Sequence, residues 1–294
     1  SASLVGSEMC IRDRGDIMRF AVIGHPIGHT MSPFIHKRLF EISGVEAEYS
    51  VMDIAPENFA SEFKNIKNLK GCNLTIPHKS AVIPLLDELH PWAKLFGAVN
   101  TVKFGEKNIG YNTDCIGFTK ALETENIPIS GKVLLCGNGG AARMMAFVCA
   151  ENGCNLTFSV RESGIEKAQK IKEEIRAAFK DAEVSVSLSE NVTGDFDLLL
   201  NATPCGMFPK IDAMPVSEKV LSKCQNVFDC IYNPNETKLL KKAKANGSKT
   251  AHGMPMLLWQ AAAAQEIWND VKFSEDDVNS LAEEAVREME RIFR

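Results

Sequence analysis

The sequence predicts an α/β protein with a mostly parallel sheet, and three observations support this fold class. Strand-like apolar runs alternate with helix-like segments along most of the chain, an order typical of parallel sheets. The apolar run 132–137 leads through a glycine turn into a helix-like segment that ends at Gly153. The length of 294 residues suits one large domain or two domains of ordinary size.

The first half of the chain is expected to hold three strands, three helices and a hairpin. The strands come from apolar or alternating runs, at 18–24, 47–53 and 72–76. The helices are expected from Ser32-Pro33 to the stop at Gly44, from 56 to 66, and near 84–90. The hairpin joins 97–102 to 108–114 around Gly105.

The second half is expected to alternate strands with helices and to end in helices. A helix follows Asp114, and the strands are expected at 132–137, 155–160, 184–188, 196–203 and 226–232. Further helices are expected at 141–153, 165–179, 236–245 and 255–269. The segment 274–277, SEDD, is a candidate N-terminal cap for a last helix.

Composition excludes several classes of protein. A net charge of -5 without a clustered basic face argues against a nucleic-acid partner, and no apolar run is long enough to span a membrane. The nine cysteines form no CxxC pair, which favours reduced thiols in a cytoplasmic protein and gives no metal site. His25 and His29 are four apart, but the glycines and proline around them preclude a shared helical metal face.

Residues 1–17 are interpreted as a non-native or disordered leader. They show no clear hydrophobic period and lack the long apolar region of a signal peptide. We therefore expect the natural start at Met18.

Gly137, Gly139 and Ala142 fit the pattern G-x-G-x-x-A between a strand and a helix. The first glycine permits a tight turn, the second lets the backbone approach a pyrophosphate, and the alanine lets the helix pack close to the strand. The helix N-terminus supplies free N–H groups for phosphate. The pattern predicts dinucleotide binding, and a plain glycine turn is the alternative.

The end of the next strand bears on the choice of cofactor. NAD sites usually carry an acidic residue there, to bond the adenosine ribose. Here Arg161 follows Val160, and an arginine suits a ribose phosphate through a bidentate, charged contact. Glu162 opposes this, because a second anion repels the phosphate unless it turns away. NADP is favoured, with NAD as the alternative.

Lys79 follows the strand 72–76, which Pro77 ends, so we expect it in a loop at the carboxyl end of a strand. Open α/β sheets bind their ligands at that edge. A lysine there can transfer a proton to or from a ketone, and a carboxylate such as Asp114 can orient it. The alternatives are a solvated lysine for Lys79 and a helix N-cap for Asp114.

Hydroxyl and amide side chains gather at loop positions before Phe118. Such groups suit a small, heavily hydroxylated acid, because they bond hydroxyl groups without requiring a charge. With two later residues they form the candidate substrate set Thr30, Ser32, Thr75, Asn100, Tyr232 and Gln260. Each also has an ordinary structural reading, such as capping for Ser32 or a turn contact for Asn100.

Eight motifs stand in the order found in the shikimate dehydrogenases, and from about Met18 to about Trp268 the chain resembles that family. They are GHPIGHTMSPFIH, NLTIPHK, GAVNT, GYNTDCIGF, GNGGAAR, NATPCGM, IYNPNET and HGMPMLLWQAA. The resemblance implies an enzyme of aromatic amino-acid biosynthesis that reduces 3-dehydroshikimate reversibly to shikimate with NADPH. It also implies a substrate domain at 18–117, mostly parallel and completed by C-terminal helices at 254–294, and a Rossmann-type NADP-binding domain at 118–253.

The resemblance further implies roles for individual residues. Lys79 and Asp114 would be the catalytic pair. The carboxylate would be bound by Thr30 and Ser32 with Tyr232 nearby, and the ring hydroxyls by Thr75, Asn100 and Gln260. The cofactor would be bound by Gly137, Asn138, Gly139, Gly140, Ala141, Arg161, Met207 and Gly253.

Some positions depart from the usual family pattern. Thr30 replaces a common serine, and its extra methyl group would either tighten the pocket or favour a relative such as quinate. His78 replaces a frequent phenylalanine, His252 replaces an asparagine, and Val160-Arg161-Glu162 replaces Asn-Arg-Thr. The alternatives are therefore a quinate/shikimate dehydrogenase with relaxed NAD/NADP use and a non-catalytic NADP-binding regulatory module. The expected partner is a small-molecule substrate, with no nucleic acid or membrane, for a monomer or homodimer.

Overall fold

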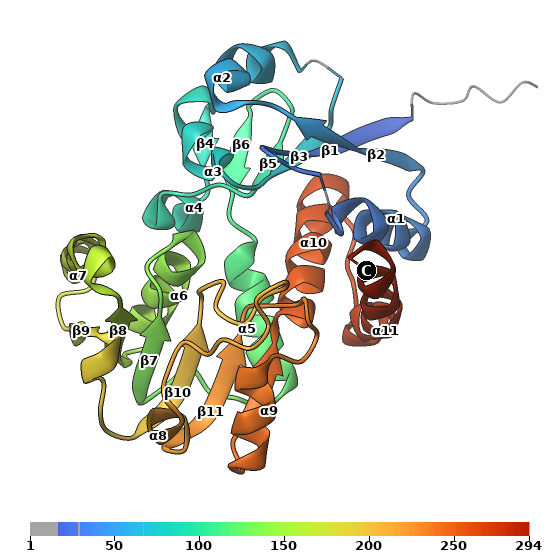
Figure 1. Ribbon diagram of the computed structural model, residues 1–294. Coiled ribbons are helices and arrows are strands. Elements are labelled where there is room, and N and C mark those ends of the chain that lie inside the picture. The colour runs from blue at the N-terminus through green and yellow to red at the C-terminus, as the bar shows by residue number, and fades with distance from the viewer. Residues whose placement is uncertain (1–16, 29, 67, 294) are drawn as a thin grey trace, which may run out of the picture.

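The computed structural model describes residues 17–28, 30–66 and 68–293. Over these residues the chain forms two six-stranded sheets with helices packed around them (Figure 1). The predicted α/β fold class is confirmed. The predicted leader lies outside the described residues except for Ile17, and His29 lies outside them too.

The first sheet carries the N-terminal strands. Its spatial order is β2 (Ala47–Asp53), β1 (Met18–Gly24), β3 (Gly71–Leu74), β5 (Thr101–Lys103), β6 (Ile109–Tyr111) and β4 (Glu88–Leu89). β1 runs parallel to both β2 and β3, and β4 runs parallel to β6. β5 is antiparallel to β3 and to β6, so the predicted hairpin is present. The strand expected at 72–76 ends at Leu74, before Thr75.

The helices of this part are α1 (Ser32–Ser43), α2 (Pro56–Asn65), α3 (His78–Ala81) and α4 (Pro91–Phe96). Pro33 lies in the first turn of α1, and Gly44 ends that helix at φ 69°, as predicted. The helix expected near 84–90 is wrong. That stretch holds the 3₁₀ turn Ile83–Leu85 and the strand β4, because Pro84 opens a short turn and Pro91 starts a new helix.

The second sheet is parallel throughout. Its order is β12 (Lys249–His252), β11 (Cys224–Asp229), β10 (Phe196–Asn201), β7 (Lys132–Cys136), β8 (Asn155–Val160) and β9 (Val184–Leu188). All five strand pairings are parallel. This is the strand order of a Rossmann fold, in which ligands bind where the order reverses, here between β7 and β10.

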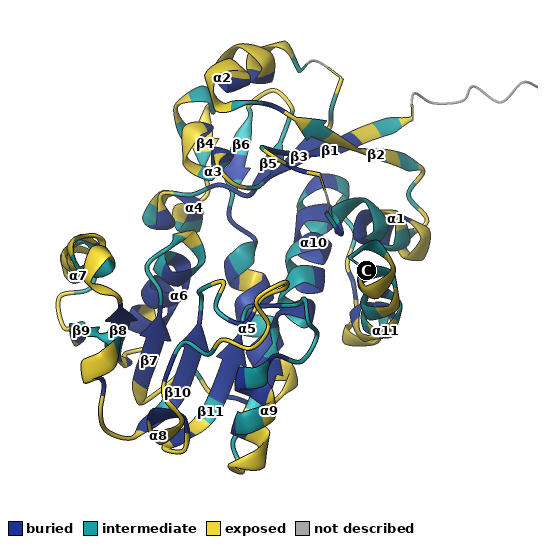
Figure 2. Ribbon diagram, viewed as in Figure 1, coloured by how far each residue is buried: buried dark blue, intermediate teal, exposed yellow. Residues whose placement is uncertain are grey.

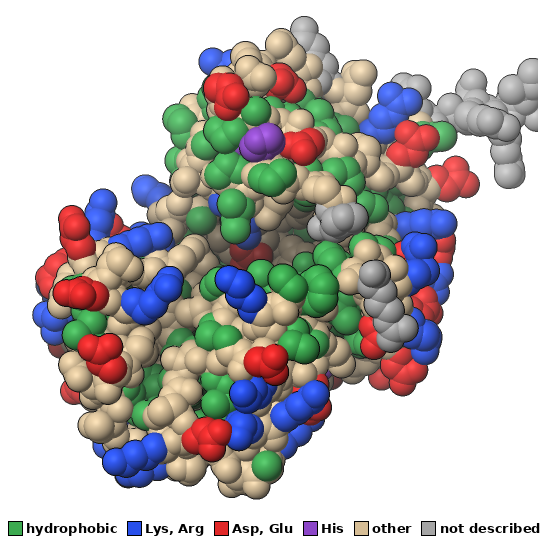
Figure 3. Space-filling model, in the orientation of Figure 1, with side chains coloured by type: hydrophobic (Ala, Val, Ile, Leu, Met, Phe, Trp, Pro, Cys, Tyr) green, Lys and Arg blue, Asp and Glu red, His purple; other side chains and the backbone are tan. Residues whose placement is uncertain are grey.

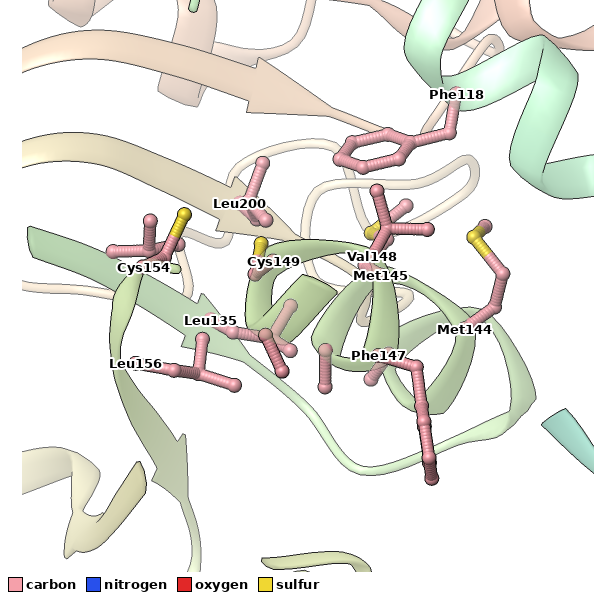
Figure 4. Packing of buried hydrophobic residues seen from close by; sticks show 14 of the residues in the cluster. Phe118, Leu135, Met144, Met145, Phe147, Val148, Cys149, Cys154, Leu156 and Leu200 are labelled. Atoms are coloured by element: carbon pink, nitrogen blue, oxygen red, sulfur yellow. The ribbon is translucent and has the colours of Figure 1, made fainter. Parts of the chain in front are cut away.

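The central strands of the second sheet are mostly buried, as Figure 2 shows for β7, β10 and β11. Its helices are α5 (Asp114–Thr124), α6 (Gly140–Glu151), α7 (Ile165–Ala178), α8 (Glu218–Leu221) and α9 (Lys238–Ala245), with 3₁₀ turns at Glu162–Gly164 and Ser189–Asn191. In Figure 4 Cys149 of α6 lies near Leu135 of β7, and both belong to one buried cluster with Met145 and with Leu156 of β8. This packing fixes the N-terminus of α6 at the edge where the strands end.

The last two helices, α10 (Gly253–Asn269) and α11 (Glu275–Ile292), pack beside α1 and the first sheet (Figure 1). Trp268 of α10 stacks on Phe20 of β1 with ring centroids 4.7 Å apart, and its Nε1 donates to the Val102 carbonyl at 2.9 Å. α10 also packs against α5, where Gly117 allows contact, because a Cβ there would lie 2.3 Å from the Met256 carbonyl. The predicted cap of α11 is present, with Ser274 and Asp277 forming a capping box.

Candidate active site

A cavity of about 250 Å³ lies between the two sheets, and Figure 3 shows the surface hollowed in this region. Helices and strand ends from both halves of the chain meet there. Its polar lining consists of Ser32, Asn73, Thr75, Lys79, Asn100, Asp114, Tyr232 and Gln260. Its remaining lining is Val22, Leu74, Ala141, Cys230, Gly253, Met256 and Leu257.

Lys79 and Asp114 form an ion pair in this cavity. Lys79 Nζ donates to Asp114 Oδ2 at 2.6 Å, and the two side chains are 31% and 20% exposed. Lys79 lies in the one-turn helix α3, so the loop expected for it is wrong. Asp114 is the first residue of α5, while Thr113 is the N-cap, so a capping role does not explain the aspartate.

Asn100 holds Asp114 from the other side. Its Nδ2 donates to Asp114 Oδ1 at 2.8 Å and to Thr113 Oγ1 at 3.0 Å. Its Oδ1 accepts the Thr113 N–H at 2.7 Å. Each oxygen of the aspartate thus has one donor in the described structure, and the lysine ammonium is oriented by a carboxylate that is itself fixed. This is the arrangement that a positioned proton-transfer group requires.

The other predicted substrate residues lie on several elements around this pair. Ser32 begins α1, and Met31 is its N-cap, so the capping alternative for Ser32 is wrong. Thr30 does not line the cavity, but its hydroxyl contacts the Ser32 hydroxyl at 3.2 Å. Burial raises the pKa of the Tyr232 phenol, so this hydroxyl remains a donor. Gln260 is anchored through its Nε2, which donates to the Leu257 carbonyl at 2.9 Å.

Asn73 also lines the cavity, and it was not predicted. The Tyr49 hydroxyl donates to Asn73 Oδ1 at 2.7 Å, and Asn73 Nδ2 donates to Thr101 Oγ1 at 3.1 Å. The sequence could have indicated Asn73, because it stands two residues before Thr75 in the predicted strand, and alternate strand residues point to the same face.

His78, next to the lysine, points away from the cavity. Its ring is fully buried and stacks on Phe59, with centroids 4.1 Å apart and planes within 7°. Its Nε2 lies 2.7 Å from the Ile54 carbonyl oxygen, which can only accept, so Nε2 is the donor. The His78 ring thus fills a buried position against Phe59, as a phenylalanine would. It also makes a hydrogen bond to Ile54, which anchors α3.

A second cavity, of about 690 Å³, lies at the carboxyl ends of β7, β8 and β10. Gly137 opens it with φ 109°, where a Cβ would lie 3.0 Å from the Ala202 carbonyl oxygen. A Cβ on Gly139 or Gly140 would meet nothing within 4 Å, so open space stands at the N-terminus of α6. Free N–H groups beside that space fit a dinucleotide pyrophosphate.

The charges around this cavity fit a further phosphate. Arg161, Lys167 and Lys210 line it, and its described lining includes no aspartate or glutamate. Glu162 lies outside the lining, in the 3₁₀ turn that follows Arg161, so its carboxylate is not part of the cavity wall. Lys167 and Lys210 were not predicted. The sequence could have indicated Lys167, because it stands in the first turns of the helix that follows Arg161.

The predicted cofactor residues are divided between the two cavities. Gly137, Asn138, Gly139 and Arg161 line the larger one, and Asn138 Nδ2 donates to the Gly164 carbonyl at 2.8 Å. Ala141 and Gly253 line the smaller one. Gly140 begins α6 between them, and Met207 is 45% exposed and lines neither.

Gly253 has no room for a side chain. A Cβ there would lie 2.2 Å from the Cys230 carbonyl oxygen, which explains glycine at the start of α10.

Known proteins resemble the chain over most of its length. A family model described as the shikimate dehydrogenase substrate binding domain matches residues 22–102. The shikimate dehydrogenase (NADP(+)) of Caldanaerobacter subterraneus subsp. tengcongensis is 39% identical over 265 residues, which cover 88% of this chain and 94% of that protein. That of Methanocaldococcus jannaschii is 40% identical, with 85% and 91% covered.

Solved structures of shikimate dehydrogenases superpose on most of the chain. The shikimate 5-dehydrogenase of Thermus thermophilus, in complex with NADP(H) and shikimate, superposes with a TM-score of 0.81 at 33% identity, covering 92% of this chain and all of that one (100%). A shikimate dehydrogenase in complex with NADP+ gives 0.82 at 35% identity, with 92% and 96% covered. With this fold, and with a lysine–aspartate pair beside a glycine turn, the chain belongs to the shikimate dehydrogenase family.

Proposed function

We propose that the protein is an NADP-dependent shikimate dehydrogenase, which reduces 3-dehydroshikimate reversibly to shikimate in chorismate and aromatic amino-acid biosynthesis. The observation that carries the proposal is the Lys79–Asp114 pair, with Nζ 2.6 Å from Oδ2, in a cavity that also presents six further polar side chains and reaches Ala141 at the α6 glycine turn. The relatives named shikimate dehydrogenase (NADP(+)) support the same reaction.

NADPH, when bound, supplies the hydride. The chain supplies the proton: the Lys79 ammonium donates to the substrate oxygen as negative charge develops there. Asp114 keeps Nζ oriented toward the reacting oxygen, and in the reverse direction the Lys79 amine takes the hydroxyl proton. Asn100 holds the carboxylate in place through its 2.8 Å bond.

The substrate is recognised by hydroxyl and amide groups of the same cavity. In this proposal Ser32, supported by Thr30, and Tyr232 bind the carboxylate. Thr75, Asn100 and Gln260 bind the ring hydroxyls, and Asn73 joins them from the neighbouring strand position. The contact of Thr30 with Ser32 supports this grouping.

In this proposal the cofactor lies mainly in the second cavity and reaches the first one at Ala141 and Gly253. Gly137, Asn138, Gly139, Gly140 and Ala141 surround the pyrophosphate, and Met207 and Gly253 border the nicotinamide. Arg161 binds the ribose phosphate, and Lys167 contributes a second cation to it.

Two domains divide these tasks in the proposal. Residues 18–117 and the C-terminal helices 254–294 form the substrate domain, and residues 118–253 form the cofactor domain. The bond from Trp268 to Val102 and the stacking of Trp268 on Phe20 support the return of the C-terminal helices to the first sheet.

Initial rates with shikimate and quinate, each with NADP and NAD, test the function. Shikimate with NADP is expected to give the highest kcat/KM. A quinate/shikimate dehydrogenase with relaxed cofactor use is the alternative, kept open by Thr30, and the Listeria monocytogenes neighbour was solved with shikimate and NAD. Faster turnover of quinate with NAD would establish that alternative, and nucleotide binding without turnover would establish a regulatory module.

The setting of the enzyme is proposed from its helices and its thiols. The part of the chain that the structure describes includes no helix long and apolar enough to cross a membrane. Its eight described cysteines are free thiols, which suits a cytoplasmic location. One chain supplies both cavities, so a monomer suffices for the chemistry, and light scattering would distinguish it from a homodimer.

A further inference from the structure

Asp229 is a buried carboxylate that lines neither cavity. It ends β11, its exposure is 0%, and three donors surround it. Asn201 Nδ2 at 2.9 Å and the Ile231 N–H at 3.1 Å both donate to Oδ1. The Thr237 hydroxyl donates to Oδ2 at 2.7 Å. Removing a carboxylate from water costs free energy even when its oxygens accept hydrogen bonds. Packing alone therefore does not explain an aspartate at this position.

One arm of this network reaches the nucleotide cavity. Asn201 Oδ1 accepts the Thr203 N–H at 3.1 Å and the Thr203 hydroxyl at 2.7 Å. Thr203 Oγ1 then accepts the Cys205 N–H at 3.2 Å, and Asn201 Nδ2 also lies 3.3 Å from the Cys205 carbonyl. Thr203 and Cys205 line the larger cavity, so Asn201 sets the conformation of one of its walls.

The other arm reaches the substrate cavity. Asp229 fixes the Ile231 N–H, which lies between Cys230 and Tyr232, and both of these line the smaller cavity. The Cys230 N–H donates to the Asn201 carbonyl at 3.0 Å, and the Gly253 N–H donates to the Ile231 carbonyl at 3.2 Å. The same carboxylate therefore braces one wall of each cavity.

We propose that Asp229, acting through Asn201 and the Ile231 backbone, is a positioning residue that sets the Thr203–Cys205 wall of the nucleotide cavity against the Cys230–Tyr232 wall of the substrate cavity for hydride transfer. The inference rests on the proposed function. Transfer between two bound molecules depends steeply on their relative placement, and an error of about 1 Å can cost about 100-fold in rate. Asp229 touches neither molecule and acts only through its neighbours.

Four variants separate positioning from stability. Asn201→Ala cuts the arm to the nucleotide cavity, and Asp229→Ala cuts both arms. Asp229→Asn can keep an oxygen toward Asn201 and Ile231 and turn its amide to the Thr237 hydroxyl, so it is the conservative variant. Asn226→Ala is the matched control, because Asn226 lies on the same strand as Asp229 but lines neither cavity, and its Nδ2 donates to the Asp197 carbonyl of β10 at 2.8 Å.

The readouts are kcat, KM and the deuterium isotope effect on kcat, with shikimate deuterated at the carbon that is oxidised. All are measured on full-length protein at a temperature where circular dichroism shows each variant folded. Asn201→Ala and Asp229→Ala are expected to lower kcat about 10-fold or more, with both KM values within about threefold. Their isotope effect is expected to exceed that of the wild type, because hydride transfer becomes slower relative to the other steps. Asp229→Asn is expected to keep most of the wild-type kcat.

Loss of thermal stability alone in Asn201→Ala, with kcat and isotope effect equal to those of Asn226→Ala, would overturn the proposal. If Asp229→Ala does not fold, Asn201→Ala and Asp229→Asn decide the matter by the same two readouts. A wild-type protein that does not turn over shikimate overturns the proposed function and this inference together, whereas an active wild type with unaltered variants overturns only the inference.

Discussion

At the scale of single residues, a few contacts hold Lys79, the proposed proton donor, in place. Its ammonium donates to Asp114, and its backbone carbonyl accepts the Val99 N–H at 2.7 Å. His78 adds an anchor on the opposite side of α3 through Ile54. A lysine on a one-turn helix is thus fixed by its neighbours rather than by the helix itself, which is too short to be stable alone.

Removal of the Lys79 ammonium is expected to stop proton transfer. Lys79→Ala should lower kcat about 100-fold or more, because a positioned acid or base contributes about 100- to 10,000-fold. Steady-state oxidation of shikimate measures the change. Lys94→Ala, on the exposed side of α4, is the control and should match the wild type. An unchanged kcat in Lys79→Ala would remove this lysine from the mechanism.

Asp229 makes stability depend on pH with a definite sign. Burial raises the pKa of its carboxyl from 3.8 to about 6, so the folded protein binds the proton more tightly than the unfolded chain does. The wild type therefore loses stability relative to Asp229→Asn as pH rises from about 4 to about 6. The loss should approach about 3 kcal/mol, at about 1.4 kcal/mol for each pH unit.

Urea unfolding of both proteins at several pH values measures this difference. Three other titratable groups lie near Asp229. Burial lowers the pKa of His252, which is paired with Asp229 across β11 and β12, and burial raises the pKa of Cys205 and of Cys230. His252 remains in the Asn variant, so subtraction of the two curves removes its contribution, and the raised pKa values of the two thiols keep both protonated throughout this pH range. A difference that is flat between about pH 4 and about pH 6 would contradict the raised pKa.

At the scale of elements, we infer that the turn from β8 into α7 selects the cofactor. Arg161 follows the strand, Lys167 lies in the helix, and both line the nucleotide cavity. Arg161→Ala should raise the KM for NADP about 10-fold or more and leave the KM for NAD nearly unchanged, because a charge-assisted bond to phosphate is lost. Lys167→Ala should act in the same direction. Glu162→Gln is the matched control, and equal effects on NADP and NAD in Arg161→Ala would exclude a contact with the ribose phosphate.

The elements also show what can be predicted from sequence and what cannot. Five strands of the second sheet were predictable, and the central ones among them are continuous apolar runs, such as 132–136, as is typical of buried parallel strands. β12 was missed because it is an edge strand, and only Ala251 among its residues is buried. β4 was missed because its two residues, Glu88 and Leu89, carry no periodic signal. α3 was missed because one turn after a proline looks like a loop.

Site residues were predictable where a local sequence motif requires a particular residue type. They were less predictable where contacts between distant segments bring the residue into the site. Gly137 and Arg161 follow from local pattern, since a tight turn and a phosphate contact constrain the residue type. Asn73 and Lys210 become part of the cavities only through packing of segments far apart in sequence. The hydrogen bonds that join Asp229 to both walls have no local signature, because its donors come from β10, the β11 end and the start of α9.

At the scale of the whole molecule, the cavity exists because the C-terminal helices return to the first sheet. α10 carries Gln260 and Gly253 in the cavity and, near its other end, Trp268 against β1. Gly71 of β3 has no room for a side chain, because a Cβ there would lie 2.2 Å from Trp268 Nε1. The indole, 7% exposed, is therefore a principal contact between the end of the chain and its beginning.

Trp268→Ala should consequently lower stability and substrate binding together. Loss of a buried aromatic ring costs about 3 to 5 kcal/mol, which should lower the urea midpoint clearly. Because α10 then shifts on β1, the KM for shikimate should rise, while the KM for NADP should change less, since the nucleotide cavity lies on the second sheet. Trp92→Ala on α4, a half-buried indole that lines neither cavity, is the control and should cost less stability and leave the KM for shikimate unchanged. A Trp268→Ala protein that loses stability but binds shikimate normally would show that α10 is held in place by α5 and α1 without the indole.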